Sequence, residues 1–213
     1  MPTLLTRPLS SARFYAILDT GYAPATRFGE LAQAVLAGGA DIIQVRAKKS
    51  TTAERIELLK VVAPLCAAAN VPLVCNDDLA AALAVPAVGL HIGQDDLPAS
   101  EARQLLGPER VLGLSTHSLT QAQRALALSD VLTYFAVGPV YKTGTKPDYP
   151  AVGLELVQAV AALKPGLPWF CIGGLNLQNA PLVRAAGTQA LVAVSEVLLA
   201  QNPAAMVKAF RGD

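Results

Sequence analysis

The chain has 213 residues, a formal net charge of +1 and 15% charged residues. Because no block of like charge stands out, the sequence lacks the basic surface that is typical of nucleic-acid binding. No apolar run reaches the about 20 residues that cross a bilayer, and we expect no secretory signal at the N-terminus. Three widely spaced cysteines, Cys66, Cys75 and Cys171, lie in apolar sequence. We therefore expect reduced, buried thiols in a cytoplasmic protein without disulfides.

Short apolar runs alternate along the chain with longer stretches in which apolar residues recur every three or four positions. The short runs predict strands at residues 14–19, 41–47, 71–76, 88–92, 110–115, 133–140, 169–174 and 190–195. The clearest helical stretches are residues 27–39, 52–69, 118–128 and 153–164. The second of these contains Pro64, where we expect a kink or a break.

Eight apolar strands that alternate with helices predict a parallel sheet covered by helices. We expect residues 1–213 to form one single-domain (β/α)8 TIM barrel, with residues 1–12 as a short N-terminal extension. The competing interpretation is an open, doubly wound sheet. In that fold the glycine-rich turn would follow the first strand, whereas Gly173-Gly174 follows the seventh predicted strand. The barrel is therefore favoured.

Polar residues gather at the C-terminal ends of the predicted strands, which is the edge where barrel enzymes carry their chemistry. In "DIIQVRAKKS", residues 41–50, the alternation of side chains along a strand would point Gln44, Arg46 and Lys48 to the same side. Any one of these polar residues has a structural explanation, such as a helix cap or a solvated strand end. Their gathering at one rim favours a binding site.

Two acidic residues at this rim suggest a metal site. Asp77 follows the third predicted strand and Asp96 the fourth, so both would face the barrel mouth. Carboxylates of this kind suit Mg²⁺, and without a cysteine or paired histidines they do not suit zinc. Arg46, Lys48 and Lys146 would add positive charge, as expected around a diphosphate.

A second anion site is predicted on the other side of the rim. Gly173-Gly174 and Ser195 follow the seventh and eighth strands, whose loops often bind phosphate in barrels. The segment "GPVYKTGTKPDYP", residues 138–150, contributes Thr143 and Thr145, and we interpret it as a binding loop or lid rather than an incidental surface loop. Two phosphorylated ligands in one mouth suggest a joining reaction that releases diphosphate.

The motifs "QVRAK", "CNDD", "GLHIGQDDL", "GLSTHS", "GPVYKTGTK", "IGG" and "VS" occur in this order along residues 44–195. Together they resemble the thiamine phosphate synthase family. The resemblance implies a transferase of (β/α)8 fold that couples hydroxymethylpyrimidine diphosphate to a thiazole phosphate, or its carboxylate, with Mg²⁺ as cofactor. It also implies a dissociative reaction, in which diphosphate leaves before the thiazole nitrogen attacks. The expected partners are small-molecule substrates alone, with no nucleic acid or membrane, and the oligomeric state stays open.

The same resemblance implies a role for each site residue. The pyrimidine diphosphate would be bound by Gln44, Arg46, Lys48, Asn76, Ser115 and Lys146. Of these, the catalytic contacts would come from Lys146, Arg46, Lys48 and Ser115. The thiazole phosphate would be bound by Thr143, Thr145, Gly174, Val194 and Ser195. Mg²⁺ would be bound by Asp77 and Asp96.

Two alternatives remain. A thiazole tautomerase would use His117 as a proton carrier and would need no metal. A non-catalytic barrel that senses thiamine precursors would keep the binding residues without turnover.

Overall fold

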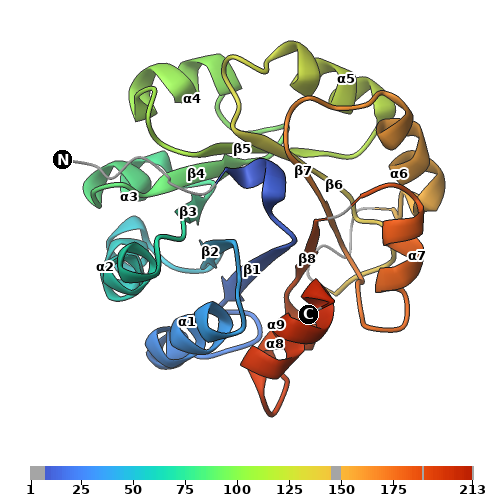
Figure 1. Cartoon of the computed structure of the whole chain (residues 1–213). Helices are drawn as coiled ribbons and strands as arrows, with labels where there is room; N and C mark the ends of the chain where they lie inside the picture. Colours follow the sequence, from blue (N-terminus) through green and yellow to red (C-terminus); the bar gives the residue numbers. More distant parts are fainter. Residues whose placement is uncertain (1–7, 145–149, 189, 213) are drawn as a thin grey trace.

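The computed structural model describes residues 8–144, 150–188 and 190–212. Eight parallel strands form a closed barrel in sequence order, because β8 pairs with β1 (Figure 1). The strands are β1 (Phe14–Asp19), β2 (Ile42–Arg46), β3 (Leu73–Asn76), β4 (Gly89–Ile92), β5 (Leu112–Thr116), β6 (Tyr134–Val137), β7 (Trp169–Ile172) and β8 (Leu191–Ala193). The predicted (β/α)8 fold is confirmed.

Helices surround the barrel in a ring (Figure 1). They are α1 (Phe28–Ala37), α2 (Thr52–Ala69), α3 (Leu79–Ala84), α4 (Ala99–Leu106), α5 (Leu119–Ala127), α6 (Gly153–Ala162), α7 (Ala180–Ala185), α8 (Ser195–Leu198) and α9 (Pro203–Arg211). Short 3-10 turns, η1 (Leu9–Ser11) and η2 (Ala25–Arg27), precede β1 and α1.

The longest helix, α2, matches the predicted range and continues through Pro64. Of the predicted kink or break at that proline, the structure excludes the break. Strong end signals hold the helix on both sides of it. Thr51 and Glu54 form a reciprocal capping box at the start, and Asn70 adopts the left-handed conformation (φ 54°) at the end.

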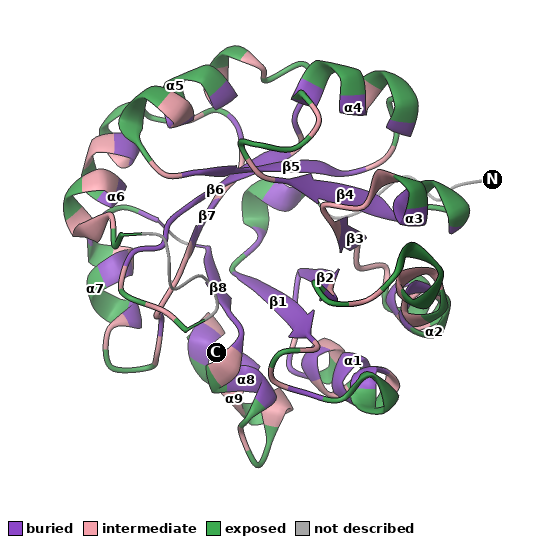
Figure 2. Cartoon of the chain, turned by 180° about the vertical axis from the view of Figure 1, so that it is seen from behind, coloured by how far each residue is buried: buried purple, intermediate pink, exposed green. Residues whose placement is uncertain are grey.

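The core lies inside the barrel and between the barrel and its helices. Figure 2 shows buried strands at the centre and exposed outer helix faces. Inside the barrel, the rings of Tyr15, Tyr134 and Phe170 meet edge to face at centroid distances of 5.3–5.7 Å. Leu9 and Ala12 are also buried, so this part of the predicted N-terminal extension packs against the core.

Several strands are shorter than predicted, most clearly at the C-terminal edge. The predicted strand at 133–140 is reduced to Tyr134–Val137, and the one at 190–195 to Leu191–Ala193. Some of the extra residues are apolar and remain buried, since Val140 is 1% exposed and Val194 is 8% exposed. The hydrophobic pattern reports burial rather than ladder hydrogen bonds, so it runs on into the loops at the barrel mouth.

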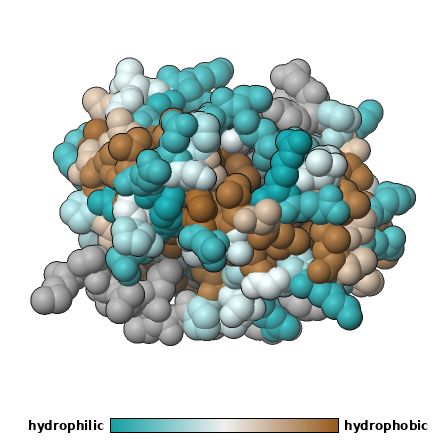
Figure 3. Space-filling model, turned by 90° about the horizontal axis from the view of Figure 1, so that it is seen from above, coloured by the Kyte–Doolittle hydropathy of each residue, from teal (hydrophilic) through white to brown (hydrophobic). Residues whose placement is uncertain are grey.

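The outer surface mixes hydrophilic and hydrophobic residues, as the face in Figure 3 shows. In the described part of the chain, no helix has both the length and the apolar character needed to cross a bilayer. Cys66, Cys75 and Cys171 are buried and free, as predicted, and burial raises the pKa of each thiol to about 12.

Candidate active site

A cavity of about 410 Å³ lies at the C-terminal ends of the strands. Every predicted site residue that the structure describes lines it. These are Gln44, Arg46, Lys48, Asn76, Asp77, Asp96, Ser115, Thr143, Gly174, Val194 and Ser195. The predicted residues Thr145 and Lys146 lie outside the described residues. Polar side chains that are far apart in sequence thus converge on one space.

Strand β2 supplies one wall of the cavity. Gln44 and Arg46 line it together, as the alternation of side chains along a strand predicts, and Lys48 joins them from the turn after β2. The guanidinium of Arg46 pairs with the carboxylate of Asp19, which is opposite Arg46 in the β1–β2 ladder and only 1% exposed. The other oxygen of Asp19 accepts a hydrogen bond of 2.8 Å from the N–H of Gly21. Asp19 therefore holds Arg46 in place at the mouth, a pairing that strand register alone could have suggested.

The polar residues after β3 diverge. Asp77 adopts a left-handed conformation (φ 62°), which aspartate tolerates better than most residues, and lines the cavity. Asp78 turns away and caps α3, where its carboxylate accepts a hydrogen bond of 2.9 Å from the N–H of Ala81. Asp78 also forms an ion pair of 2.8 Å with Arg55 on α2. Of these two adjacent carboxylates, Asp77 thus belongs to the cavity, and Asp78 stabilises the surrounding helices.

At the mouth, Asp96 lies within the influence of the Asp77 carboxylate. Burial, helped by the neighbouring carboxylate of Asp77, raises the pKa of Asp96 above its ordinary value. Asp96 accepts a hydrogen bond of 2.7 Å from the N–H of Gly93, and Lys48 Nζ lies 3.0 Å from Asp77 Oδ2. A carboxyl group whose ionisation is opposed by burial and by a neighbouring negative charge is a suitable place for a divalent cation.

The described residues form no group of three or more His, Cys, Asp or Glu side chains able to hold a metal ion. A cation at Asp77 and Asp96 would therefore complete its coordination with water or ligand oxygens, which is the usual habit of Mg²⁺. The donor set fits magnesium and does not fit a structural zinc site.

The opposite wall brings backbone close to the cavity. Gly173 and Gly174 both have positive φ values, 103° and 63°. A Cβ at Gly173 would lie 2.4 Å from Pro139 Cα, and one at Gly174 would lie 2.6 Å from the carbonyl oxygen of Lys142. Glycine is required at both positions, because the loops after β6 and β7 could not otherwise pack together.

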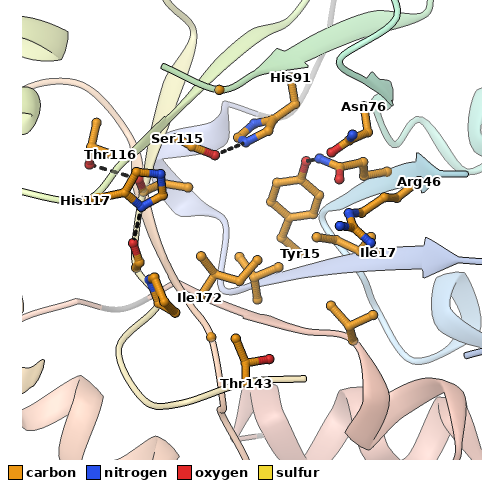
Figure 4. A pocket seen from close by; sticks show the side chains of 18 of the residues that line it. Tyr15, Ile17, Arg46, Asn76, His91, Ser115, Thr116, His117, Thr143 and Ile172 are labelled. Atoms are coloured by element: carbon orange, nitrogen blue, oxygen red, sulfur yellow. Dashed lines mark hydrogen bonds between the residues drawn. The ribbon is translucent and has the colours of Figure 1, made fainter. Parts of the chain in front are cut away.

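Beneath the cavity runs a chain of hydrogen bonds that the sequence analysis missed. Gln44 Nε2 donates a hydrogen bond of 2.6 Å to Tyr15 Oη, and the hydroxyl oxygens of Tyr15 and Tyr134 lie 2.8 Å apart. Tyr134 Oη lies 2.8 Å from His91 Nδ1. His91 Nε2 in turn lies 2.9 Å from Ser115 Oγ, a contact that Figure 4 shows. In the sequence both tyrosines lie within apolar strands and look like ordinary core residues, so no pattern marked them.

His117 also lines the cavity, on the side nearer β6 (Figure 4). Its Nδ1 forms a short hydrogen bond with the carbonyl oxygen of Gly138, and its backbone N–H donates a hydrogen bond of 2.6 Å to Gln121 Oε1. These contacts orient the imidazole along the wall.

A family model described as thiamine monophosphate synthase matches residues 14–197. A thiamine-phosphate synthase of Mycolicibacterium smegmatis is 43% identical over 83% of this chain and 81% of the relative. One of Streptomyces avermitilis is 40% identical over 99% of this chain and 97% of the relative. Among solved structures, a thiamine phosphate pyrophosphorylase of Pyrococcus furiosus superposes with a TM-score of 0.84, at 28% identity over 96% of each chain.

Proposed function

The chain belongs to the thiamine monophosphate synthase family, and from that premise we propose that its barrel mouth joins hydroxymethylpyrimidine diphosphate to a thiazole phosphate. The products are thiamine phosphate and diphosphate, with CO₂ as well when the thiazole arrives as its carboxylate. The observation that supports the proposal is one cavity whose lining brings together the described residues predicted for both phosphorylated reactants.

The diphosphate half of the cavity lies at the ends of β2, β3 and β4. Arg46 and Lys48 bring positive charge to one wall, and Asp77 and Asp96 face it from the neighbouring strands. In the proposed complex, Arg46 and Lys48 bind diphosphate oxygens directly, while Asn76 and Gln44 lie close enough in the same lining to contact the pyrimidine. Asp77 and Asp96 would hold Mg²⁺, which when bound neutralises charge that builds on the departing diphosphate.

The thiazole phosphate half lies at the ends of β6, β7 and β8. Gly174 and Val194 offer backbone there, and Thr143 and Ser195 offer hydroxyls. Asn179 holds Gly174 in place, because its side-chain amide donates a hydrogen bond of 2.9 Å to the carbonyl oxygen of Gly174. Ser195 begins the short helix α8, and loops after the last two strands together with such a helix often bind phosphate in barrels.

In the proposed mechanism the chain works by positioning and charge rather than by proton transfer. Arg46 and Lys48 stabilise the leaving diphosphate, so that a pyrimidine-stabilised methylene cation forms. The anchor around Ser195 holds the thiazole nitrogen about 3–3.5 Å from that carbon. The attacking nitrogen carries no proton, so no general base is needed. Lys146 and Thr145, which lie outside the described residues, are proposed to contact the diphosphate and the thiazole phosphate.

One assay tests the proposal against its alternatives. Both substrates are mixed with the protein, with and without Mg²⁺, and thiamine phosphate and diphosphate are measured. We expect equal amounts of both products, and only with Mg²⁺. Isomerisation of the thiazole phosphate without Mg²⁺, abolished by His117→Gln, would instead identify a tautomerase. Binding without any product would identify a precursor-sensing barrel and would contradict the proposal.

The predicted cytoplasmic location, the absence of nucleic-acid and membrane partners and the single-domain boundaries stay predictions.

A further inference from the structure

We propose that Tyr15, Tyr134 and His91 form a buried relay that makes Gln44 an acceptor and Ser115 a donor toward the pyrimidine, and that this polarity selects a 4-amino over a 4-oxo ring. The inference rests on the proposed function, because it assumes that an aminopyrimidine occupies the cavity. The three relay residues act through Gln44 and Ser115, so they are positioning residues.

The relay crosses the barrel interior and joins five different strands. Its members belong to β2, β1, β6, β4 and β5 in the order Gln44, Tyr15, Tyr134, His91 and Ser115. Consecutive members are separated by 2.6, 2.8, 2.8 and 2.9 Å. The exposed fractions are 2% for Gln44, 1% for Tyr15, 0% for Tyr134, 7% for His91 and 9% for Ser115. With the relay almost closed to solvent, its members depend on each other for hydrogen bonds.

Proton counting sets the direction of the relay. Gln44 Nε2 donates to Tyr15 Oη, so the one hydroxyl proton of Tyr15 remains for its other partner, Tyr134. If Tyr134 donated to Tyr15 instead, the proton of Tyr15 would have no acceptor among its hydrogen-bond partners. A buried donor without an acceptor is strongly disfavoured. Tyr15 therefore donates to Tyr134.

The same reasoning continues to the far end. Because Tyr134 accepts from Tyr15, it donates its own proton to His91 Nδ1. A neutral imidazole that accepts at Nδ1 carries its proton on Nε2, and Nε2 then donates to Ser115 Oγ. The hydroxyl proton of Ser115 is left for a ligand. At the near end, the carbonyl oxygen of Gln44 is left as an acceptor.

This pattern of one acceptor and one donor matches a 4-aminopyrimidine. Such a ring presents an amino group, which donates, and ring nitrogens, which accept. Gln44 and Ser115 both line the cavity and can meet these groups. A 4-oxo ring presents the reverse, a carbonyl oxygen beside a ring N–H. The carbonyl oxygen of the 4-oxo ring would then face the carbonyl oxygen of Gln44, and neither could donate a hydrogen bond. A binding site strongly rejects a ligand that leaves its buried polar groups unpaired.

Selectivity between two diphosphates tests the relay. The kcat/KM for hydroxymethylpyrimidine diphosphate is compared with that for its 4-oxo analogue, in the wild type, Tyr15→Phe and Tyr134→Phe. We expect the wild type to prefer the amino compound by at least about 10³-fold. Each phenylalanine variant uncouples Gln44 from Ser115, so the preference should fall by about ten-fold or more, chiefly through KM. An unchanged preference in Tyr15→Phe would overturn the proposal.

A matched control separates the relay from a loss of stability. Thr188 is 1% exposed, shares hydrogen bonds of 3.3 Å with the backbone of Ala190, and does not line the cavity. Thr188→Val also removes a buried hydroxyl, and it should lower the melting temperature while keeping the preference for the amino ring. Loss of preference in this control to the same degree would also overturn the proposal.

His91 offers a second and more direct test. His91→Gln can accept from Tyr134 and donate to Ser115, so it should retain more of the preference than His91→Leu. The chain has two histidines, so nitrogen NMR of His117→Gln reports the His91 imidazole alone. We expect the proton on Nε2. A proton on Nδ1 would reverse the direction of the relay and contradict the assigned polarity. If the tyrosine variants fail to fold, this NMR measurement alone tests the proposal.

The proposed function and the relay fail in different ways. If the wild type forms no thiamine phosphate from the amino substrate, the proposed function fails. If it forms thiamine phosphate but the preference does not depend on Tyr15, only the relay fails.

Discussion

At the scale of single residues, the sequence segment "CNDD" shows how neighbours can serve different ends. The left-handed conformation of Asp77 turns its carboxylate into the cavity, while Asp78 caps α3 and pairs with Arg55. The motif could be recognised in the sequence, and it located the mouth correctly. Which acid faces the cavity depends on one backbone torsion angle, and no sequence pattern encodes that directly.

Asp77→Asn should raise the Mg²⁺ concentration needed for half-maximal activity by more than about ten-fold. Replacing a residue that only supports a metal ligand already lowers metal affinity about ten-fold, so replacing a ligand should lower it further. The amide keeps the shape of Asp77 but removes its charge. Mg²⁺ titration of product formation measures the effect. Asp130→Asn, at an exposed position, is the control and should leave the titration unchanged. The same Mg²⁺ dependence in both variants would argue against Asp77 as a ligand.

Asp96→Asn should raise the melting temperature of the metal-free protein at pH 7 while it impairs turnover. Burial and the charge of Asp77 raise the pKa of Asp96 in the folded state. The folded protein thus binds this proton more tightly than the unfolded chain, so ionisation of Asp96 opposes folding as pH rises through the folded pKa. Asparagine removes that cost and can still accept from Gly93. Calorimetry without Mg²⁺ measures the change, and a lower melting temperature would contradict it.

The pairing of Asp19 with Arg46 gives a third prediction at this scale. Asp19→Asn removes the charge that holds the Arg46 guanidinium, so the KM for the pyrimidine diphosphate should rise by about ten-fold, since charge-assisted hydrogen bonds are among the stronger ones. Steady-state kinetics with each substrate varied in turn measures it. The KM for the thiazole phosphate should stay close to the wild-type value. An equal rise for both substrates would indicate a general distortion of the mouth instead.

At the scale of elements, Asp78 joins α2 to α3. Burial by itself would raise the pKa of Asp78, but hydrogen bonds from the Ala81 N–H, Arg55 and Thr52 outweigh it and lower that pKa below its usual value of 3.8. A lowered pKa means that the ionised carboxylate stabilises the fold. This contribution is complete above pH 3.8 and is lost as pH falls through the lower folded pKa.

Asp78→Ala should therefore lower the free energy of unfolding near pH 7 by about 1–2 kcal/mol, the range for loss of a helix N-cap. Urea unfolding of both proteins over a pH series measures the difference, which should shrink in strong acid as Asp78 becomes protonated in the wild type. Ser118, which caps α5 and accepts 3.2 Å from the Gln121 N–H, provides a comparison. The difference caused by Ser118→Ala should not depend on pH in that range, because serine does not titrate.

The order and type of the elements could largely be predicted, because buried parallel strands and amphipathic helices have different periods. The strand at Phe14–Asp19 and the helix at Thr52–Ala69 agree with their predicted ranges. Strand ends at the mouth could not be predicted, since the buried loops there continue the apolar pattern. The relay beneath the cavity was also beyond prediction, because tyrosines such as Tyr15 and Tyr134 meet only when the barrel closes.

At the scale of the whole molecule, closure depends on contacts between the two ends of the described chain. Strand β8 pairs with β1, and Arg211 at the end of α9 reaches back to Asp41 at 2.6 Å and to the carbonyl oxygen of Gly39 at 2.7 Å. Asp41 is 4% exposed and also accepts from the N–H groups of Arg13 and Phe14. The ion pair thus fastens the last helix to the start of β1.

Arg211→Ala should destabilise the fold by about 3–5 kcal/mol, because it removes one member of a buried ion pair. Chemical unfolding measures the loss. Arg124→Ala, at an exposed position on α5, should stay within about 0.5 kcal/mol of the wild type. Similar small effects in both variants would show that the pair contributes little to closure.

The distribution of the cavity lining along the chain has a consequence for how this scaffold can be modified. The charged wall comes from residues 44–96, whereas the glycine and hydroxyl wall comes from residues 143–195. Under the proposed assignment, the donor of the transferred group is bound by residues 44–115 together with Lys146, and the acceptor is bound by the other residues of the stretch 143–195. A chimera that keeps residues 44–115 and Lys146 and takes the rest of the later stretch from a homologous barrel would then accept a different phosphorylated nucleophile while retaining the same diphosphate donor.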